Sequence, residues 1–128
     1  IKPKVYSLST NVETITAIVN DIGSEEMFSF QLSSLGEEGD LLIAISSSGA
    51  SPNIIKALHL ARSMGMKTIA MTGFQGGESA KIADVSLHVD CENYGIVEDL
   101  HQSLMHILAQ YCRNNRFDEP GKLGTLKF

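Results

Sequence analysis

Residues 41–64 combine an apolar run, a serine-rich turn and an amphipathic segment, and this combination constrains the fold more than any other part of the chain. Residues 41–45 (Leu-Leu-Ile-Ala-Ile) form a short continuous apolar run, typical of a strand that is buried on both faces of a parallel sheet. A helix is predicted to follow, because Ser51 is a favourable N-cap and Pro52 suits the first helical position. Gly65 is the expected stop.

The loop between strand and helix, residues 46–51 (Ser-Ser-Ser-Gly-Ala-Ser), gathers hydroxyls and backbone N–H groups at the positive end of the helix dipole. It contains no lysine or arginine and lacks the Gly-Lys-Ser/Thr ending of nucleoside triphosphate loops. Neutral donors and a helix dipole suit a phosphate monoester. From the serines alone, a turn whose hydroxyls only cap a helix is an equally good interpretation.

Alternating strand and helix patterns with short loops predict an α/β sandwich on a parallel sheet, with ligands beyond the carboxyl ends of the strands. We expect strands at residues 4–8, 41–45, 67–71 and 85–89, the last near the sheet edge, and helices at about 12–22, 24–35, 52–64 and 94–115, with a helical turn at 79–83. Residues 1–116 are expected to form one domain and residues 117–128 a tail.

Composition favours a small-molecule-binding protein. The chain has 128 residues, 43% of them hydrophobic and 20% charged, enough for one domain with a true core. Its net charge of -5 gives no basic footprint, so nucleic acid is a poor candidate ligand. Cys91 and Cys112 form no metal pair or redox motif, and no signal peptide or membrane-spanning stretch is visible. A cytoplasmic protein without a membrane partner is expected.

Residues 45–53 resemble the phosphate-binding signature of sugar isomerase (SIS) domains, in which Ser-x-Ser-Gly ends a strand and a hydroxyl residue two positions later caps the next helix. Further matches lie in the order and spacing of sedoheptulose 7-phosphate (phosphoheptose) isomerases: residues 20–23 (Asn-Asp-Ile-Gly), 27–28 (Met-Phe), 65–67 (Gly-Met-Lys), 71–73 (Met-Thr-Gly), 76–77 (Gly-Gly) and 83–84 (Ala-Asp). The resemblance implies a three-layer, flavodoxin-like α/β/α sandwich. The chain begins at Ile1, and the first strand and N-terminal helices of that fold are expected to be missing from it.

The resemblance also implies a reaction: aldose–ketose isomerisation of a sugar phosphate, sedoheptulose 7-phosphate or a related sugar, in heptose or surface polysaccharide synthesis. His106 matches the catalytic histidine of these enzymes, and its partner glutamate belongs to the missing segment. The substrate phosphate would be held by Ser46, Ser47, Ser48 and Ser51, and the sugar hydroxyls by Asp21. His101 matches a second histidine of the family, and a structural role is the stronger expectation for it.

Two departures from the resembled enzymes affect recognition of the sugar. Glu98 replaces a glutamine and Gly95 replaces an aspartate. Glu98 is a candidate substrate-binding residue that lies about 80° round the helix from His106. Because some family members bind zinc through the corresponding glutamine and histidine, zinc or another divalent cation at Glu98 and His106 is a candidate cofactor.

Two expectations concern partners. The broad apolar face of residues 96–111, together with the multimeric habit of the resembled enzymes, predicts a homodimer or homotetramer. The rival to an isomerase is a non-catalytic SIS module that senses a sugar phosphate or regulates a protein partner. His106 favours the enzyme, because a silent module has no need of an imidazole there.

Overall fold

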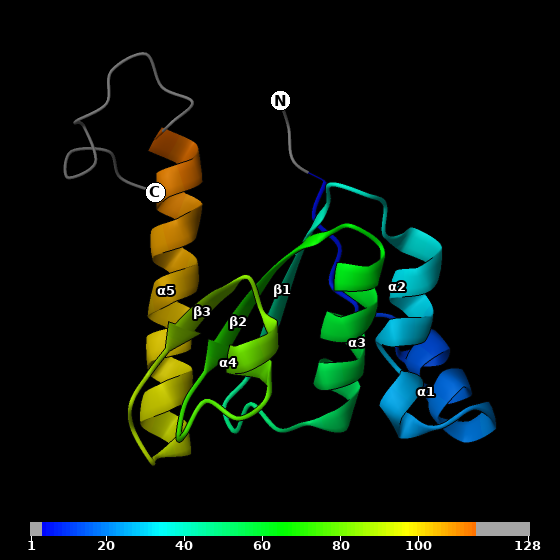
Figure 1. Ribbon diagram of the computed structural model, residues 1–128, viewed down its shortest axis with the longest axis horizontal. Helices are drawn as coiled ribbons and strands as arrows, with labels where there is room; N and C mark the ends of the chain where they lie inside the picture. Colours follow the sequence, from blue (N-terminus) through cyan, green and yellow to red (C-terminus); the bar gives the residue numbers. More distant parts are fainter. Residues whose placement is uncertain (1–3, 115–128) are drawn as a thin grey trace.

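The computed structural model describes residues 4–114 of the chain. These residues form, in chain order, α1 (Val12–Asp21), the 3-10 turn η1 (Ser24–Glu26), α2 (Ser29–Leu35), β1 (Leu41–Ser46), α3 (Pro52–Ser63), β2 (Lys67–Thr72), α4 (Ser79–Ile82), β3 (Val85–His88) and α5 (Tyr94–Asn114) (Figure 1). The predicted tail at 117–128 lies outside the described residues. No helix of the described part is long and apolar enough to cross a membrane.

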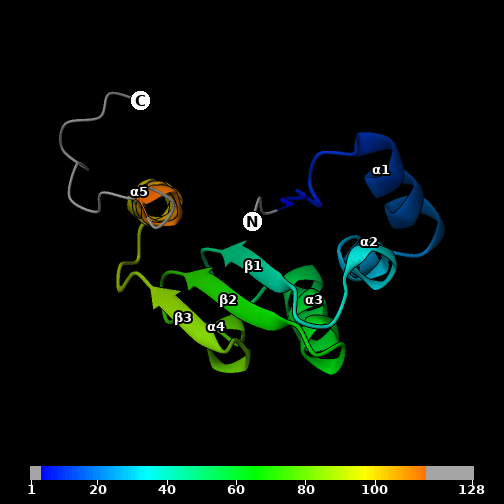
Figure 2. The same cartoon turned by 90° about the horizontal axis from the view of Figure 1, so that it is seen from above.

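The three strands form one parallel sheet in the order β1-β2-β3, with Leu41 opposite Lys67 and Ile69 opposite Val85. Figure 2 shows α3 and α4 on one side of the sheet and α5 on the other. Parallel strands joined by crossover helices bring all three carboxyl ends to one edge, where the loops after β1 and β2 meet. The predicted α/β architecture on a parallel sheet is therefore confirmed, as is the edge position of β3.

The core lies between the sheet and α3. Leu58 is fully buried on the inner face of α3 and packs with Ala44 of β1 and Ile82 of α4. A second cluster extends the core toward α2 through Leu32 and Ala61. Burying a leucine side chain contributes about 1.5–3 kcal/mol, so these contacts hold α3, and with it the loop that precedes α3, against the sheet.

The expected strand at residues 4–8 is absent, and this prediction was wrong. Val5 is 85% exposed and Tyr6 is 71% exposed. A strand needs a hydrogen-bonded neighbour, and within residues 4–114 the only pairings are β1 with β2 and β2 with β3. Residues 24–35 also differ from prediction, because η1 and α2 are separated by a turn at residues 27–28 rather than joined in one helix.

The expectation that β1 is buried on both faces was also wrong. Its side chains alternate: Ala44 and Ser46 are buried toward α3, while Leu41, Ile43 and Ile45 are 43–52% exposed. Alternation is the pattern of a strand covered on one face only. Among the described residues β1 pairs with β2 alone, so it ends the sheet instead of occupying its centre.

Candidate functional site

The serine loop, residues 46–51, leaves β1 in a tight turn and enters α3. The N–H of Gly49 donates to the carbonyl oxygen of Ser46 at 2.9 Å, and Gly49 adopts a left-handed φ of +64°. The turn brings the hydroxyl oxygens of Ser46 and Ser51 to 3.2 Å. Two of the predicted phosphate ligands therefore lie side by side at the start of α3.

Ser51 takes the predicted N-cap position of α3, but its hydroxyl caps nothing. Its carbonyl oxygen accepts the N–H groups of Ile54 and Ile55, both at 3.0 Å. The hydroxyl turns toward Ser46 instead of satisfying a first-turn N–H. The Ser51 hydroxyl therefore does not cap the positive dipole end of α3. Together with the neighbouring serines, this helix start offers hydrogen-bond donors suited to an oxyanion.

A second loop, residues 73–79, braces the serine loop from the carboxyl end of β2. Gly73 donates its N–H to the carbonyl of Ser47 at 2.7 Å, and Ser79 donates its N–H to the carbonyl of Gly49 at 2.9 Å. Ser47 and Ser48 are half-buried as a result of this packing. Backbone hydrogen bonds from residues 73 and 79, and not charged side chains, therefore hold this side of the serine loop.

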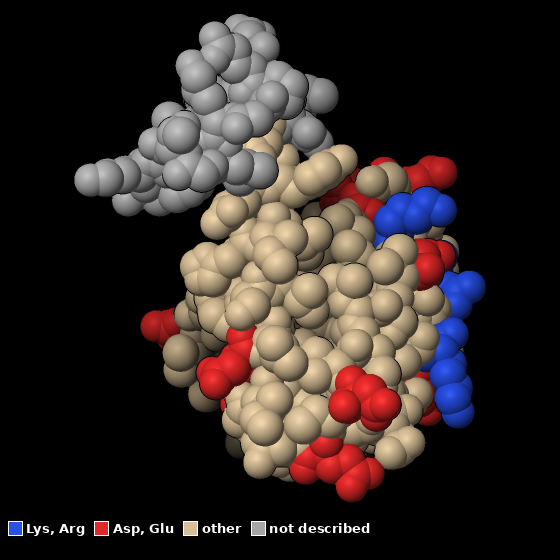
Figure 3. Space-filling model, turned by 90° about the vertical axis from the view of Figure 1, so that its left-hand side faces the viewer, with Lys and Arg blue, Asp and Glu red and all other residues tan. Residues whose placement is uncertain are grey.

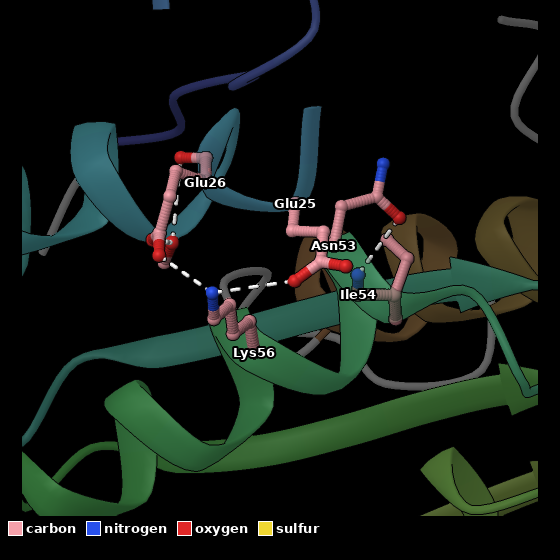
Figure 4. Close-up of polar contacts among 6 residues, drawn as sticks. Glu25, Glu26, Asn53, Ile54 and Lys56 are labelled. Carbon is pink, nitrogen blue, oxygen red and sulfur yellow. Dashed lines mark hydrogen bonds and ion pairs between the residues drawn. The ribbon is translucent and has the colours of Figure 1, made fainter. Parts of the chain in front are cut away.

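The lysine in the second turn of α3 is committed elsewhere. Lys56 forms ion pairs with Glu26 at 2.6 Å and Glu25 at 3.4 Å, which attach η1 to α3 (Figure 4). The hydrogen bond to Glu26 raises the pKa of Lys56, and the same bond, aided by one from Ser29, lowers the pKa of Glu26. The carboxylates of Glu25 and Glu26 therefore neutralise the ammonium group of Lys56. The hydrogen-bond donors of the serine loop itself are uncharged hydroxyl and backbone N–H groups.

Helix α5 carries the predicted acid/base group. Asn93 accepts the N–H of Ile96 at 3.1 Å and so caps the start of α5. Glu98 and His106 are both exposed, and the Nε2 atom of His106 lies 3.4 Å from the amide nitrogen of Gln102. His106 follows Glu98 by eight positions, so the two residues lie about 12 Å apart along the helix axis.

The described residues do not join the predicted site into one cluster. Across residues 4–114, no hydrogen bond links Glu98 or His106 to the serine loop. Asp21 lies at the end of α1, where its carboxylate accepts from the side-chain amide of Asn20 at 2.8 Å. The hydroxyls of Ser46 and Ser51 contact each other, whereas no hydrogen bond within residues 4–114 joins Asp21, Glu98 or His106 to these serines.

Comparison with known proteins places this geometry in a family. The family model described as SIS domain matches residues 2–73, more than half of the chain, including β1, the serine loop and β2. The chain belongs to the SIS domain family. In this SIS domain, the matched segment ends at the glycine that donates to Ser47.

The SIS domain is similar to phosphoheptose isomerases in sequence and in structure. It is 41% identical over 103 residues to that of Nitratidesulfovibrio vulgaris strain Hildenborough, covering 80% of this chain and 50% of the relative. It is 41% identical over 111 residues to that of Helicobacter pylori strain P12, covering 87% and 57%. The chain therefore spans about half the length of the curated relatives it matches.

Solved structures give the same result. The structure of a phosphoheptose isomerase from Neisseria gonorrhoeae aligns with a TM-score of 0.79 and 38% identity, covering 80% of this chain and 58% of that one. The corresponding structure from Francisella tularensis aligns with a TM-score of 0.77 and 36% identity, covering 79% and 55%. The SIS fold of the described residues is confirmed by these matches.

The residues of this SIS domain do not by themselves fit a metal ion. A protein zinc site takes three or four side-chain ligands, and residues 4–114 contain no group of three histidine, cysteine, aspartate or glutamate side chains placed to hold one. Glu98 and His106 are two exposed donors on one helix. A cation at this position would need further ligands, and we route no chemical step through one.

Sequence reasoning missed the contacts made by Thr72. This residue is fully buried at the carboxyl end of β2, and its hydroxyl lies 3.1 Å from the Nδ1 atom of His88. Its carbonyl oxygen lies 3.1 Å from the Nε2 atom of His101. His88 is exposed, yet it has this partner. The only sequence signal was the Met-Thr-Gly match at residues 71–73.

Proposed function

We propose that this SIS domain binds the phosphate of an open-chain sugar phosphate, and that the protein is an aldose–ketose isomerase acting on sedoheptulose 7-phosphate or a related ketose phosphate. The proposal includes a role in heptose or surface polysaccharide synthesis. Its support is the identity of about 40% to phosphoheptose isomerases, combined with a serine loop that brings two hydroxyls together at the start of α3.

The proposed reaction moves one carbon-bound proton. A base removes a proton from C1 of the ketose to give an enediol, an acid delivers a proton to C2, and the hydroxyl proton passes from O1 to O2, so the atoms balance. Such proton transfers need groups whose charge changes near working pH, and an imidazole meets this requirement without special tuning. His106 is the proposed acid/base group on this chain, with a carboxylate as its partner.

The remaining site residues take binding roles in the proposal. Ser46, Ser47, Ser48 and Ser51 donate hydrogen bonds to the phosphate together with the start of α3. Asp21 accepts hydrogen bonds from sugar hydroxyls, and Glu98 contacts the substrate or helps to hold a divalent cation such as zinc when further ligands are supplied. No hydrogen bond within residues 4–114 joins Asp21, Glu98 or His106 to the serine loop, so these three roles rest on the resemblance to phosphoheptose isomerases.

We further propose that the protein is a cytoplasmic homodimer or homotetramer that associates through α5. Within α5 only Val97 and His101 are buried among the described residues, whereas Ile96, Leu100, Ile107 and Tyr111 are 44–64% exposed. Figure 3 shows few charged side chains on the side of the molecule that α5 occupies. An exposed apolar surface with so little charge is typical of a subunit interface.

The observation that carries the proposal is the paired hydroxyls of Ser46 and Ser51 at the start of α3. The test is incubation of the intact protein with sedoheptulose 7-phosphate in deuterated water, followed by NMR of the product. Aldose formation with deuterium at C2 is expected, because the proton taken up by the acid/base group exchanges with solvent before one is delivered to C2 of the enediol. Absence of any aldose from sedoheptulose 7-phosphate and shorter ketose phosphates would contradict an isomerase.

A non-catalytic sugar-phosphate sensor is the second candidate. The observation in its favour is that no hydrogen bond within residues 4–114 joins His106 to the serine loop, because binding needs only the loop. Calorimetry combined with the isomerisation assay distinguishes the two: a sensor binds ketose phosphates and converts none of them.

A further inference from the structure

One peptide group connects three parts of the site. The peptide unit between Thr72 and Gly73 donates its N–H to the carbonyl of Ser47 in the serine loop at 2.7 Å. The carbonyl oxygen of the same unit accepts the N–H of Val89 at 2.8 Å and lies 3.1 Å from the Nε2 atom of His101 on α5. The serine loop and α5 therefore contact the two ends of a single planar group.

Packing alone does not explain a histidine at position 101. It is 2% exposed, and because Thr72 offers a carbonyl oxygen, its Nε2 must carry the hydrogen. Its Nδ1 atom is buried and has no hydrogen-bond partner within residues 4–114. A buried polar atom without a partner is destabilising, so an apolar side chain would fill the same space at lower cost. The bond to Thr72 is what distinguishes histidine here.

Few contacts fix α5 on the sheet. Val97 and His101, four residues apart on one helix face, are its only buried side chains among the described residues. Val97 packs so closely on Gly73 that a Cβ added there would lie 2.6 Å from both Val97 methyl carbons. Tyr94 adds a ring contact with Phe74, with centroids 4.6 Å apart. Of these contacts, the hydrogen bond from His101 is the directional one.

We propose that His101 is a positioning residue: its Nε2–H bond to the Thr72 carbonyl fixes α5, and with it Glu98 and His106, relative to the serine loop. This inference rests on the proposed isomerase function. The distance from phosphate to acid/base group must be held closely, since a misplacement of about 1 Å can cost on the order of 10²-fold in rate. The Thr72–Gly73 peptide unit supplies that fixed distance through atoms of the main chain.

The test compares two replacements of His101 in the intact protein. His101→Leu fills the space and removes the donor, whereas His101→Gln keeps an N–H at a similar distance from the backbone. We expect the leucine variant to lose about tenfold or more in kcat with KM for sedoheptulose 7-phosphate within about threefold, and the glutamine variant to recover most of the loss. Asp84→Asn, which weakens the hydrogen bonds to Thr68 at the other end of β2 from Thr72, controls for lowered stability and should keep kcat below its melting temperature.

A second pair of variants moves α5 without touching His101. Gly73→Ala should displace Val97 and lower kcat as His101→Leu does, because the added Cβ would meet both Val97 methyls. Combining Gly73→Ala with Val97→Ala removes those methyls and should restore part of the activity. Equal kcat in His101→Leu and wild type, or a glutamine variant no better than the leucine variant, would overturn the inference.

Hydrogen–deuterium exchange of α5 gives a readout that is independent of turnover. His101→Leu should speed amide exchange across residues 94–114 while residues 46–64 stay protected, and His101→Gln should not. If the wild-type protein isomerises no ketose phosphate, the proposed function fails while this exchange pattern still decides the role of His101 in fixing α5. Unchanged exchange in His101→Leu would overturn that role.

Discussion

Gly49 and Gly77 pack backbone against backbone: a Cβ atom added at Gly77 would lie 2.4 Å from the carbonyl carbon of Gly49. The reverse is equally tight, because a Cβ added at Gly49 would lie 2.0 Å from the carbonyl oxygen of Gly76. Both Gly49 and Gly77 have positive φ, at +64° and +56°. The shape of the serine loop therefore depends on the loop after β2, although 27 positions separate the two glycines in the sequence.

Gly49→Ala is expected to destabilise the protein and to weaken phosphate binding. Alanine at positive φ costs about 1–2 kcal/mol, and displacing the 76–77 backbone adds about 1–3 kcal/mol. Gly39→Ala is the matched control, because Gly39 also has positive φ, at +88°, but nothing lies within 4 Å of its added Cβ. Urea unfolding and calorimetry with inorganic phosphate measure the two effects. Equal losses in both variants would mean that the contact between the loops is unimportant.

The double variant Ser46→Ala/Ser48→Ala should weaken sugar-phosphate binding by well over tenfold. Each hydroxyl lost removes a charge-assisted hydrogen bond worth about 1.5–3 kcal/mol, and no lysine or arginine lies in the loop to compensate. Ser63→Ala, on the far end of α3, is the control, because within residues 4–114 its hydroxyl bonds only to the carbonyl of Leu60. Isothermal titration of the intact protein would refute the phosphate assignment if the double variant kept wild-type affinity.

Asp84 should make the protein less stable in acid. The hydroxyl and backbone N–H of Thr68, both 2.8 Å from its carboxylate, hold the pKa of Asp84 below its usual value. The folded protein therefore binds this proton less readily than the unfolded chain. The resulting stabilisation is present above the unfolded pKa and is lost as pH falls through the folded pKa.

Asp84→Asn removes that titration, so its urea midpoint should fall less than the wild-type midpoint between about pH 7 and pH 3. Asp90→Asn, at an exposed carboxylate, serves as the control. Parallel acid profiles for wild type and Asp84→Asn would show that Thr68 does not favour the charged carboxylate.

The sequence predicted those parts of the fold that local patterns determine. The unit from β1 through α3 was recognisable because the apolar run, the N-cap at Ser51 and the stop at Gly65 all lie within 25 residues. The sequence could not show that residues 4–8 form no strand. An apolar pattern indicates only that a strand is possible, whereas strand pairing depends on a neighbouring strand. For the same reason the exposed side chains of β1 could not be foreseen.

The candidate site divides in the same way. The serines were predicted together because they are consecutive and the chain turns within them. The link from Ser47 through the Thr72–Gly73 peptide to His101 joins residues from three elements, and no spacing in the sequence signals it. No hydrogen bond within residues 4–114 joins His106 to the serine loop, so its catalytic role stays a prediction.

Self-association through α5 predicts that a charge on its apolar face will split the oligomer. Ile107 is 61% exposed in this structure, and Ile107→Asp would bury an unpaired carboxylate in the proposed interface. Ala109→Asp is the control, because residue 109 is exposed and lies about 200° round the helix from residue 107. Light scattering should show smaller particles for Ile107→Asp alone. A wild-type monomer, or an unchanged Ile107→Asp oligomer, would exclude this interface.

His106→Ala tests the proposed acid/base group most directly. Loss of a positioned general acid or base lowers turnover by on the order of 10²–10⁴, and the serine loop is separate, so phosphate affinity should stay nearly constant. Glu98→Gln is the matched variant on the same helix: it keeps the size of the side chain and removes its charge, and it should cost far less. Turnover of sedoheptulose 7-phosphate is measured with and without chelator, since loss of turnover on chelation would indicate that the reaction requires a metal. Wild-type turnover in His106→Ala would assign the proton transfer to another residue.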